Sequence, residues 1–334
     1  MRSRFRSWHS SVVVCCLFVV AGCADGGGTA SSTAATTSAP TTTVAPSDPL
    51  VGRGEVEVVG EGYGFLEGPQ WMPDDGVLVF SESDLTRPWA EQPGTIYQLA
   101  DGDEITAFRK SSSAYNGLAL DPQGRLLAAE PGARRVTRTE PDGTVNPIAD
   151  RFEGARLNEP NDIVVRSDGT IYFTDPLFEQ SAAELDFRGV FRIAPNGDLT
   201  AERRGAISES PNGVALSPDE SLLYVADTYA QTVRVFDVAA DGSLSDGRGF
   251  ATTAGFPDGM TVDAVGNLFV ASVGFGIEVF APDGTRWGTI PLPNPGLDGR
   301  QPSNCAFGGA DRRTLYITAN EVLYRVTLPH PGLY

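Results

Sequence analysis

One short pattern recurs six times along this chain and constrains its fold more than any other feature. Each copy starts with a polar residue and continues through two apolar runs separated by a turn, most clearly in SPNGVALSPDESLLYVADT at 210–228. Such runs predict an antiparallel hairpin that returns the chain to the end where the polar residue lies. The polar residues, which stand 45 to 51 positions apart, are Glu67, Asn116, Asn161, Asn212, Asp258 and Asn304.

The repeat also indicates how many sheets form and how they close. A third strand pattern follows the hairpin in most copies, and six such copies without helical periodicity predict an all-β, six-bladed β-propeller. Residues 54–59, GEVEVV, predict a strand without a hairpin of its own, whereas the last copy, 304–328, has only three strands. We therefore expect the N-terminal strand to complete the last blade and remove its open edge.

The first residues differ in composition from the repeat. Segment 1–22 has three arginines before an apolar run at 12–21, which is typical of a signal peptide and too short to span a membrane. It ends in VAGC, which resembles a bacterial lipobox with Cys23 as the lipidated residue; the alternative is an ordinary secretory signal with a chance cysteine. We expect an exported protein, lipid-anchored through Cys23 to the outer face of the bacterial cytoplasmic membrane.

The remaining composition assigns a linker and narrows the partners. Residues 23–49 are rich in Thr, Ser, Ala and Pro without apolar periodicity, which predicts a disordered linker before a propeller at 50–334. The formal net charge of −18 argues against nucleic acid as a partner. Cys305 is the one cysteine after Cys23, and without a histidine near it in the sequence we expect a buried structural thiol. Nothing in the sequence indicates an oligomeric state.

Propeller geometry places the polar residues together. The first strand of each blade lines the central channel, so the six residues that begin first strands should meet at one end of it. Residues 14 or 15 positions further on return to that end, and these are Glu82, Glu130, Asp175, Asp227 and Ser272. The insertions at 83–93 and 176–188 follow two of these positions, so we expect them to rim the channel mouth and enclose a small-molecule pocket.

The ring of polar residues predicts a cation site. Glycine follows most of them, so tight turns could explain the asparagines, but they explain Glu67 and Asp258 poorly. Two carboxylates about 4 Å apart repel by about 4 kcal/mol at an effective dielectric of about 20, and a bound cation removes that repulsion. His330 is the one histidine after the leader, which excludes imidazole-based zinc and copper sites as well as a Ser-His-Asp triad. Carboxylate and amide oxygens favour Ca²⁺, with another divalent cation possible.

Several motifs together resemble the senescence-marker-protein/gluconolactonase family of six-bladed propellers. They are LEGPQW, NEPNDIVV with YFTDP, SPNGVALSPDESLLYVADT and FPDGMTVD, and they extend over nearly the whole predicted propeller. The resemblance implies a Ca²⁺ ion held by Glu67, Asn161, Asn212 and Asp258. It implies hydrolysis of lactones, mostly sugar lactones, whereas related members hydrolyse phosphotriesters. This chain departs from some animal members at Glu159, where they carry a substrate-contacting arginine, and it lacks the histidine pair of paraoxonase-like relatives.

The leading functional hypothesis is a calcium-dependent lactone hydrolase. Asp258 would be the catalytic residue, either as general base or as nucleophile. Asn116, Glu130 and Asp175 would contact the substrate, or alternatively support the ring from behind. Two other functions stay open: phosphotriester hydrolysis on the same calcium site, and a non-catalytic propeller that binds calcium or a partner.

Overall fold

The computed structural model describes residues 47–100, 102–179, 183–293 and 301–333. The predicted signal peptide, the lipidation site Cys23 and most of the predicted linker lie outside the described residues. All described residues belong to one compact unit, Ala45–Tyr334. Among them, no helix is long and apolar enough to cross a membrane.

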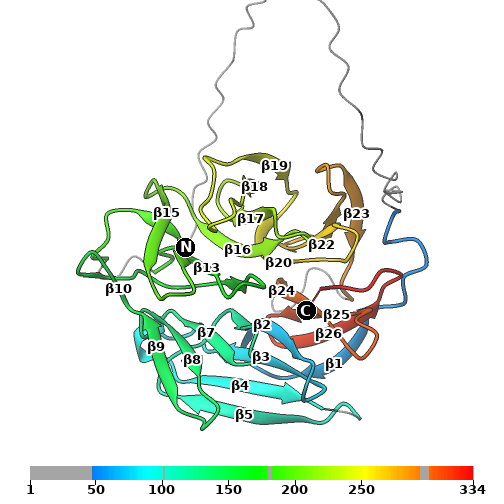
Figure 1. Cartoon of the computed structure of the whole chain (residues 1–334). Helices are drawn as coiled ribbons and strands as arrows, with labels where there is room; N and C mark the ends of the chain where they lie inside the picture. The colour runs from blue at the N-terminus through cyan, green and yellow to red at the C-terminus, as the bar shows by residue number, and fades with distance from the viewer. Residues whose placement is uncertain (1–46, 101, 180–182, 294–300, 334) are drawn as a thin grey trace, which may run out of the picture. The chain divides into compact units, whose positions relative to one another are not determined.

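The described residues form six four-stranded antiparallel sheets, which confirms the predicted propeller (Figure 1). The first sheet contains β2 (Phe65–Met72), β3 (Val77–Ser83), β4 (Gly94–Leu99) and β5 (Ile105–Ser111). The second contains β6 (Leu118–Leu120), β7 (Leu126–Glu130), β8 (Arg135–Thr139) and β9 (Val145–Ala149). The third contains β12 (Ile163–Val165), β13 (Ile171–Asp175), β14 (Arg188–Ile193) and β15 (Leu199–Gly205).

The second half of the chain repeats this arrangement. The fourth sheet contains β16 (Pro211–Leu216), β17 (Leu222–Asp227), β18 (Thr232–Asp237) and β19 (Arg248–Thr252). The fifth contains β20 (Phe256–Val262), β21 (Leu268–Val273), β22 (Gly276–Phe280) and β23 (Arg286–Ile290). The sixth contains β24 (Pro302–Gly308), β25 (Thr314–Ala319), β26 (Val322–Thr327) and, at its outer edge, β1 (Glu57–Glu61).

The ring closes as the sequence predicts. β1 pairs antiparallel with β26, with Glu57 opposite Arg325, so the N-terminal strand completes the last sheet. The strand begins three residues later than expected, although the amide of Gly54 already donates to the carbonyl of Thr327 at 2.8 Å. Contacts begin earlier still, because Pro49 is buried and the Ser47 hydroxyl lies 2.7 Å from the His330 ring.

The apolar core lies between neighbouring sheets. One cluster joins Phe269 of the fifth sheet to Phe307 of the sixth, and another joins Leu127 of the second to Phe191 of the third. Each sheet is therefore covered on both faces, which explains why the second strands are apolar runs without alternation and why β7 and β13 are buried at every position. The fourth strands are less buried, and β5 is exposed at four of its seven positions.

Two local elements were not predicted. A 3-10 turn, η1 (Trp89–Glu91), forms in the first insertion, and a two-residue hairpin, β10 (Arg151–Phe152) with β11 (Ala155–Arg156), stands between the second and third sheets. Each strand of this hairpin has only two residues, too few for a hydrophobic pattern. Its turn residues Glu153 and Gly154 both have positive φ, at 52° and 91°.

Candidate active site

Irregular strand pairing aims the polar residues into the channel. The register between first and second strands shifts beside Glu67, Asn212, Asp258 and Asn304, in β2, β16, β20 and β24. A bulge of this kind bends a strand and redirects its side chains, and it commonly occurs next to active sites. Asn116 and Asn161 instead lie just before the short strands β6 and β12, where their amides bond to the neighbouring second strand.

The glycines that follow most of these residues have a packing role that the sequence did not reveal. A Cβ atom on Gly213 would lie 2.2 Å from the carbonyl oxygen of Asp258, and one on Gly259 would lie 2.1 Å from Oδ1 of Asn304. Gly68 and Gly117 likewise touch the corresponding residue of the next sheet. Among these four only Gly68 has a positive φ, so close approach between neighbouring first strands, more than turn geometry, requires glycine here.

Five of the six polar residues are buried, and the bond between Asn304 and Glu67 joins two sheets. Oε2 of Glu67 accepts from the Gly68 amide at 2.9 Å and from Nδ2 of Asn304 at 3.1 Å. Asn212 donates through Nδ2 to the Thr228 hydroxyl at 3.0 Å, which leaves its Oδ1 atom buried and without a protein partner. Asp258 alone among the six is half-buried as a residue.

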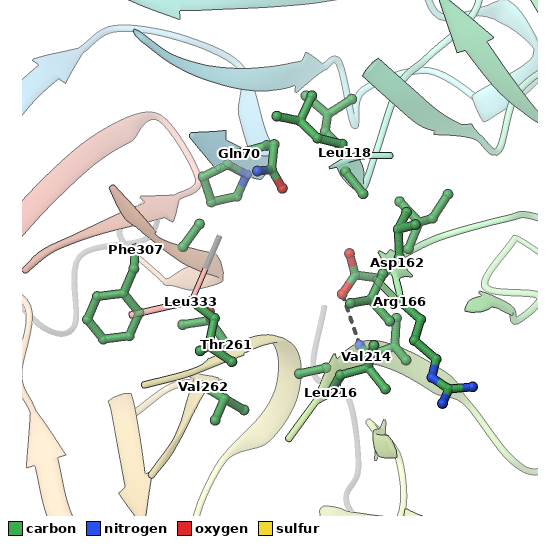
Figure 2. Close-up of a pocket in the computed structure, with 18 of the residues that line it drawn as sticks. Gln70, Leu118, Asp162, Arg166, Val214, Leu216, Thr261, Val262, Phe307 and Leu333 are labelled. Atoms are coloured by element: carbon green, nitrogen blue, oxygen red, sulfur yellow. Dashed lines mark hydrogen bonds between the residues drawn. The ribbon is translucent and has the colours of Figure 1, made fainter. Parts of the chain in front are cut away.

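A third carboxylate, Asp162, belongs to this cluster and was missed by the sequence analysis. It is 6% exposed, and its Oδ2 atom accepts the Val214 amide at 3.0 Å (Figure 2). Asp162 stands directly after Asn161, at the position where four other copies carry glycine and the last copy carries Cys305. The aspartate of NEPND was thus visible as an exception to the glycine pattern.

Burial and mutual repulsion shift the titration of these acids upward. Burial raises the pKa of Asp162 to about 6. Burial, with the nearby charge of Asp162, raises the pKa of Asp258 to about 8. The pKa of Glu67 rises well above its ordinary value through burial and then through the charges of Asp258 and Asp162. The cluster therefore disfavours full ionisation unless positive charge is brought to it.

The predicted residues at the ends of the second strands mainly hydrogen-bond to the segment that leads into the first strand of the same sheet. Glu82, Asp175, Asp227 and Ser272 each accept the amide of a residue just before the polar residue of their own sheet, at 2.7 to 3.2 Å. Asp175 uses Oδ2 in this way, with Asn158 as the donor, and its Oδ1 atom is buried without a partner. Burial raises the pKa of Asp175 to about 7.

Glu130 is engaged differently. Its side chain is fully buried, with Oε1 accepting from the Thr137 hydroxyl at 2.8 Å and Oε2 from the Arg135 guanidinium at 2.9 Å. Both oxygens therefore have protein partners. Asn116, by contrast, keeps a buried Oδ1 atom without one. Of the three residues expected to meet the substrate, Asn116 and Asp175 have an acceptor left over and Glu130 does not.

A cavity of about 660 Å³ occupies the channel beyond the ring (Figure 2). Its wall is formed by residues that follow the polar residues along the first strands, including Leu118, Val214 and Leu216, and Asp162 also lines it. None of the described residues of the two insertions lines it, so the cavity and the insertions lie on opposite sides of the ring. The insertions meet instead at the mouth, where the Trp89 amide donates to the Glu179 carboxylate at 2.9 Å.

This combination defines a six-bladed β-propeller with carboxylates and amides gathered around one end of its channel. The model of the SMP-30/gluconolactonase/LRE-like region matches residues 65–321, and the chain belongs to this family. The family inferred from the motifs is thereby confirmed.

Similar proteins agree with this assignment. The gluconolactonase of Zymomonas mobilis is 35% identical, over 81% of this chain and 80% of its own length. The 6-deoxy-6-sulfogluconolactonase of Pseudomonas putida is 36% identical, over 74% of each chain. Among solved structures, a gluconolactonase from Xanthomonas campestris superposes with a TM-score of 0.74 at 32% identity, covering 84% of this chain and 92% of that one.

Proposed function

We propose that this protein is a metal-dependent carboxylic-ester hydrolase that opens sugar lactones, with Ca²⁺ as its cation. The observation that carries the proposal is the ring of Glu67, Asn161, Asn212 and Asp258 at the channel mouth of a chain whose relatives include named sugar lactonases. The first three of these residues are buried and Asp258 is half-buried. Buried acidic and amide side chains meeting at one end of a propeller channel have no packing role that would require their charge.

The residues present fit a hard divalent cation. The Oδ1 atom of Asn212 is buried without a protein partner. The charge of Asp162 raises the pKa of Asp258, and the charges of Asp258 and Asp162 raise the pKa of Glu67. Within the described ranges, no group of three or more His, Cys, Asp or Glu side chains is arranged to hold a metal by itself. The asparagine oxygens would therefore complete the site, with Glu67, Asn161, Asn212 and Asp258 as the ligands, and oxygen donors of this kind suit Ca²⁺.

The chain's own residues supply the remaining chemistry. A bound cation would polarise the lactone carbonyl and stabilise the negative charge that develops on its oxygen. Asp258 is the least buried residue of the ring, so it takes the proton of the attacking water at a carboxylate oxygen, or attacks the carbonyl carbon itself. Asn304 holds Glu67 in place through its hydrogen bond, and Asp162 adds negative charge beside both acids.

Two buried acceptors favour a polyhydroxylated substrate. Asn116 Oδ1 and Asp175 Oδ1 lack protein partners, and a buried acceptor without a donor is destabilising. Hydroxyl groups of a sugar lactone would donate to them, whereas an aliphatic lactone or a phosphotriester has no such donors. Glu130, with both oxygens engaged, would support this part of the site from behind.

A substrate panel assayed with calcium and with chelator tests this function. We expect hydrolysis of aldonolactones that is lost in chelator and restored by calcium. Greater activity on a phosphotriester such as paraoxon than on any lactone would favour the phosphotriesterase alternative. Tight calcium binding without turnover of either class would indicate a non-catalytic calcium-binding propeller.

We further propose that residues 1–22 are removed as a lipoprotein signal peptide and that Cys23 carries the lipid. Residues 23–46 would then tether the propeller to the outer face of the bacterial cytoplasmic membrane. The support is the lipobox-like VAGC and the composition of the following segment. Lactones formed outside the cell would be the substrates available at that place.

A further inference from the structure

Two buried side chains of opposite charge hold the start of the second insertion. The Glu159 carboxylate accepts the amides of Phe178 at 2.5 Å and Glu179 at 3.2 Å, and the Arg188 guanidinium donates to the carbonyl of Leu177. Glu159 is 5% exposed and Arg188 is 6% exposed. The backbone of three consecutive loop residues, 177–179, is thus hydrogen-bonded to charged side chains. Burying these charges costs free energy, which indicates that the loop is held in one defined position.

This loop lies beside the ring of polar residues at the end of the channel. Glu159 lies two residues before Asn161 in the chain, so the loop is anchored at the level of that ring member. The ring of Phe178 meets the ring of Tyr229 edge to face, with centroids 6.2 Å apart. Tyr229 follows Thr228, whose hydroxyl accepts from Asn212. The two aromatic rings therefore form a wall next to Asn161 and Asn212, and Tyr229 is 62% exposed.

The same loop also supports the first insertion. The Glu179 carboxylate accepts the Trp89 amide at 3.0 and 2.9 Å, and Trp89 is 8% exposed. Hydrogen bonds thus run from Glu159 through the loop backbone to Glu179, and from there to the 3-10 turn. One buried carboxylate fixes elements of both insertions at the mouth.

We propose that Glu159 is a positioning residue that selects the substrate by holding Phe178 against Tyr229. The wall takes the carbon substituents of the lactone ring, because the edges and faces of aromatic rings pack well against the C–H groups of a sugar. This deepens the proposed function and rests on it. Oε2 of Glu159 accepts both amides and Oε1 accepts the Glu179 amide as well, whereas a glutamine offers one oxygen and places an NH₂ donor where the second oxygen lies.

Amide hydrogen exchange tests the positioning role without any substrate. Glu159→Gln is compared with Glu184→Gln, whose carboxylate lies in the same insertion but accepts the Arg156 amide instead. We expect exchange at Phe178 and Glu179 to accelerate about tenfold or more in Glu159→Gln, with a smaller acceleration at Trp89, and to stay unchanged in Glu184→Gln. Unchanged exchange at Phe178 and Glu179 in Glu159→Gln overturns the proposal.

Kinetics with two lactones test the selection. Glucono-1,5-lactone carries substituents that reach the wall, whereas δ-valerolactone has the same reacting ester and none of them. We expect Glu159→Gln and Phe178→Ala to raise KM for the sugar lactone about tenfold, with kcat within threefold, and to change KM for valerolactone less than twofold. An equal loss with both lactones contradicts selection. If the wild type hydrolyses no lactone, the proposed function is wrong, while the exchange data still decide whether Glu159 holds the wall.

Discussion

The Nδ2 atom of Asn304 donates a 3.1 Å hydrogen bond to Oε2 of Glu67, and this contact joins the last copy of the repeat to the first. Replacement by alanine removes a donor from a buried acid and should destabilise the protein by about 1.5–3 kcal/mol, the range for hydrogen bonds to charged groups. Urea unfolding measures the change, with the exposed Asn146→Ala as the control. Equal midpoints for the two variants would show that the bond contributes little.

Asp258 and Glu67 should separate into different roles. Asp258→Asn keeps an oxygen donor but removes the base, so at saturating calcium we expect turnover of a sugar lactone to fall by about 10² to 10⁴. Glu67→Gln should first weaken calcium binding, with activity partly recovered at high calcium. The measurement is turnover over a calcium titration for both variants. Near wild-type turnover in Asp258→Asn would move the base to Asp175 or Glu82.

Calcium should stabilise the fold, and more strongly at alkaline pH. A ligand at a hundredfold excess over its dissociation constant adds about 2.7 kcal/mol to the free energy of unfolding. Because the pKa of Asp258 is raised to about 8, a proton must leave for the carboxylate to bind the ion, so affinity should rise between pH 6 and pH 8. Thermal melts with calcium and with chelator at both pH values check this. Identical melting temperatures throughout would rule out the site.

Asp175 should make the folded state less stable as pH rises. Its folded pKa of about 7 lies above the ordinary value of 3.8, so between these values the folded state holds a proton that the unfolded chain has lost. Stability from this group is present at acid pH and is lost as pH rises to about 7, at up to roughly 1.4 kcal/mol per pH unit. Asp175→Asn should therefore gain stability relative to wild type from pH 5 to pH 7. The measurement is the free energy of unfolding in urea as a function of pH for both proteins. Parallel profiles for Asp175→Asn and the wild type would refute this prediction.

Cys23→Ala should release the protein from the membrane. The lipobox-like sequence and the polar segment behind it motivate this expectation. Cell fractionation followed by immunoblotting compares the mutant with the wild type. A mutant that stays as firmly in the membrane fraction as the wild type would exclude a lipid anchor at this residue.

The fold could be predicted because its information is local and repeated. Six hairpin patterns at one spacing fix the number of sheets, and the missing fourth strand of the last copy assigns a place to β1. The hairpin β10–β11 was not predicted, because strands of two residues show no hydrophobic periodicity. Its conformation depends on backbone turns at Glu153 and Gly154 that the sequence does not specify on its own.

The site was predictable only in part, for a physical reason. Glu67 and Asp258 stand out because carboxylates have no reason to begin a buried strand, and Asp162 could have been found as an acid where neighbouring copies carry glycine. The role of Glu159 could not be predicted from the sequence. Its partners are the backbone amides of Phe178 and Glu179, and backbone amides are present at nearly every position of any chain. Spacing alone also placed Glu130 beside the substrate, whereas Arg135 and Thr137 occupy its oxygens.

Pairing of β1 with β26 governs the order in which this protein can be completed. Arg325 bonds to Glu57 across 268 positions of sequence, so β1 stays without its partner strand until synthesis is nearly finished. Contacts of such long separation slow folding, and the unpaired strand β1 is open to pairing with other chains in the meantime. The two ends of the folded unit share one sheet, so a truncation or fusion at the C-terminus acts on the sheet that secures the N-terminus.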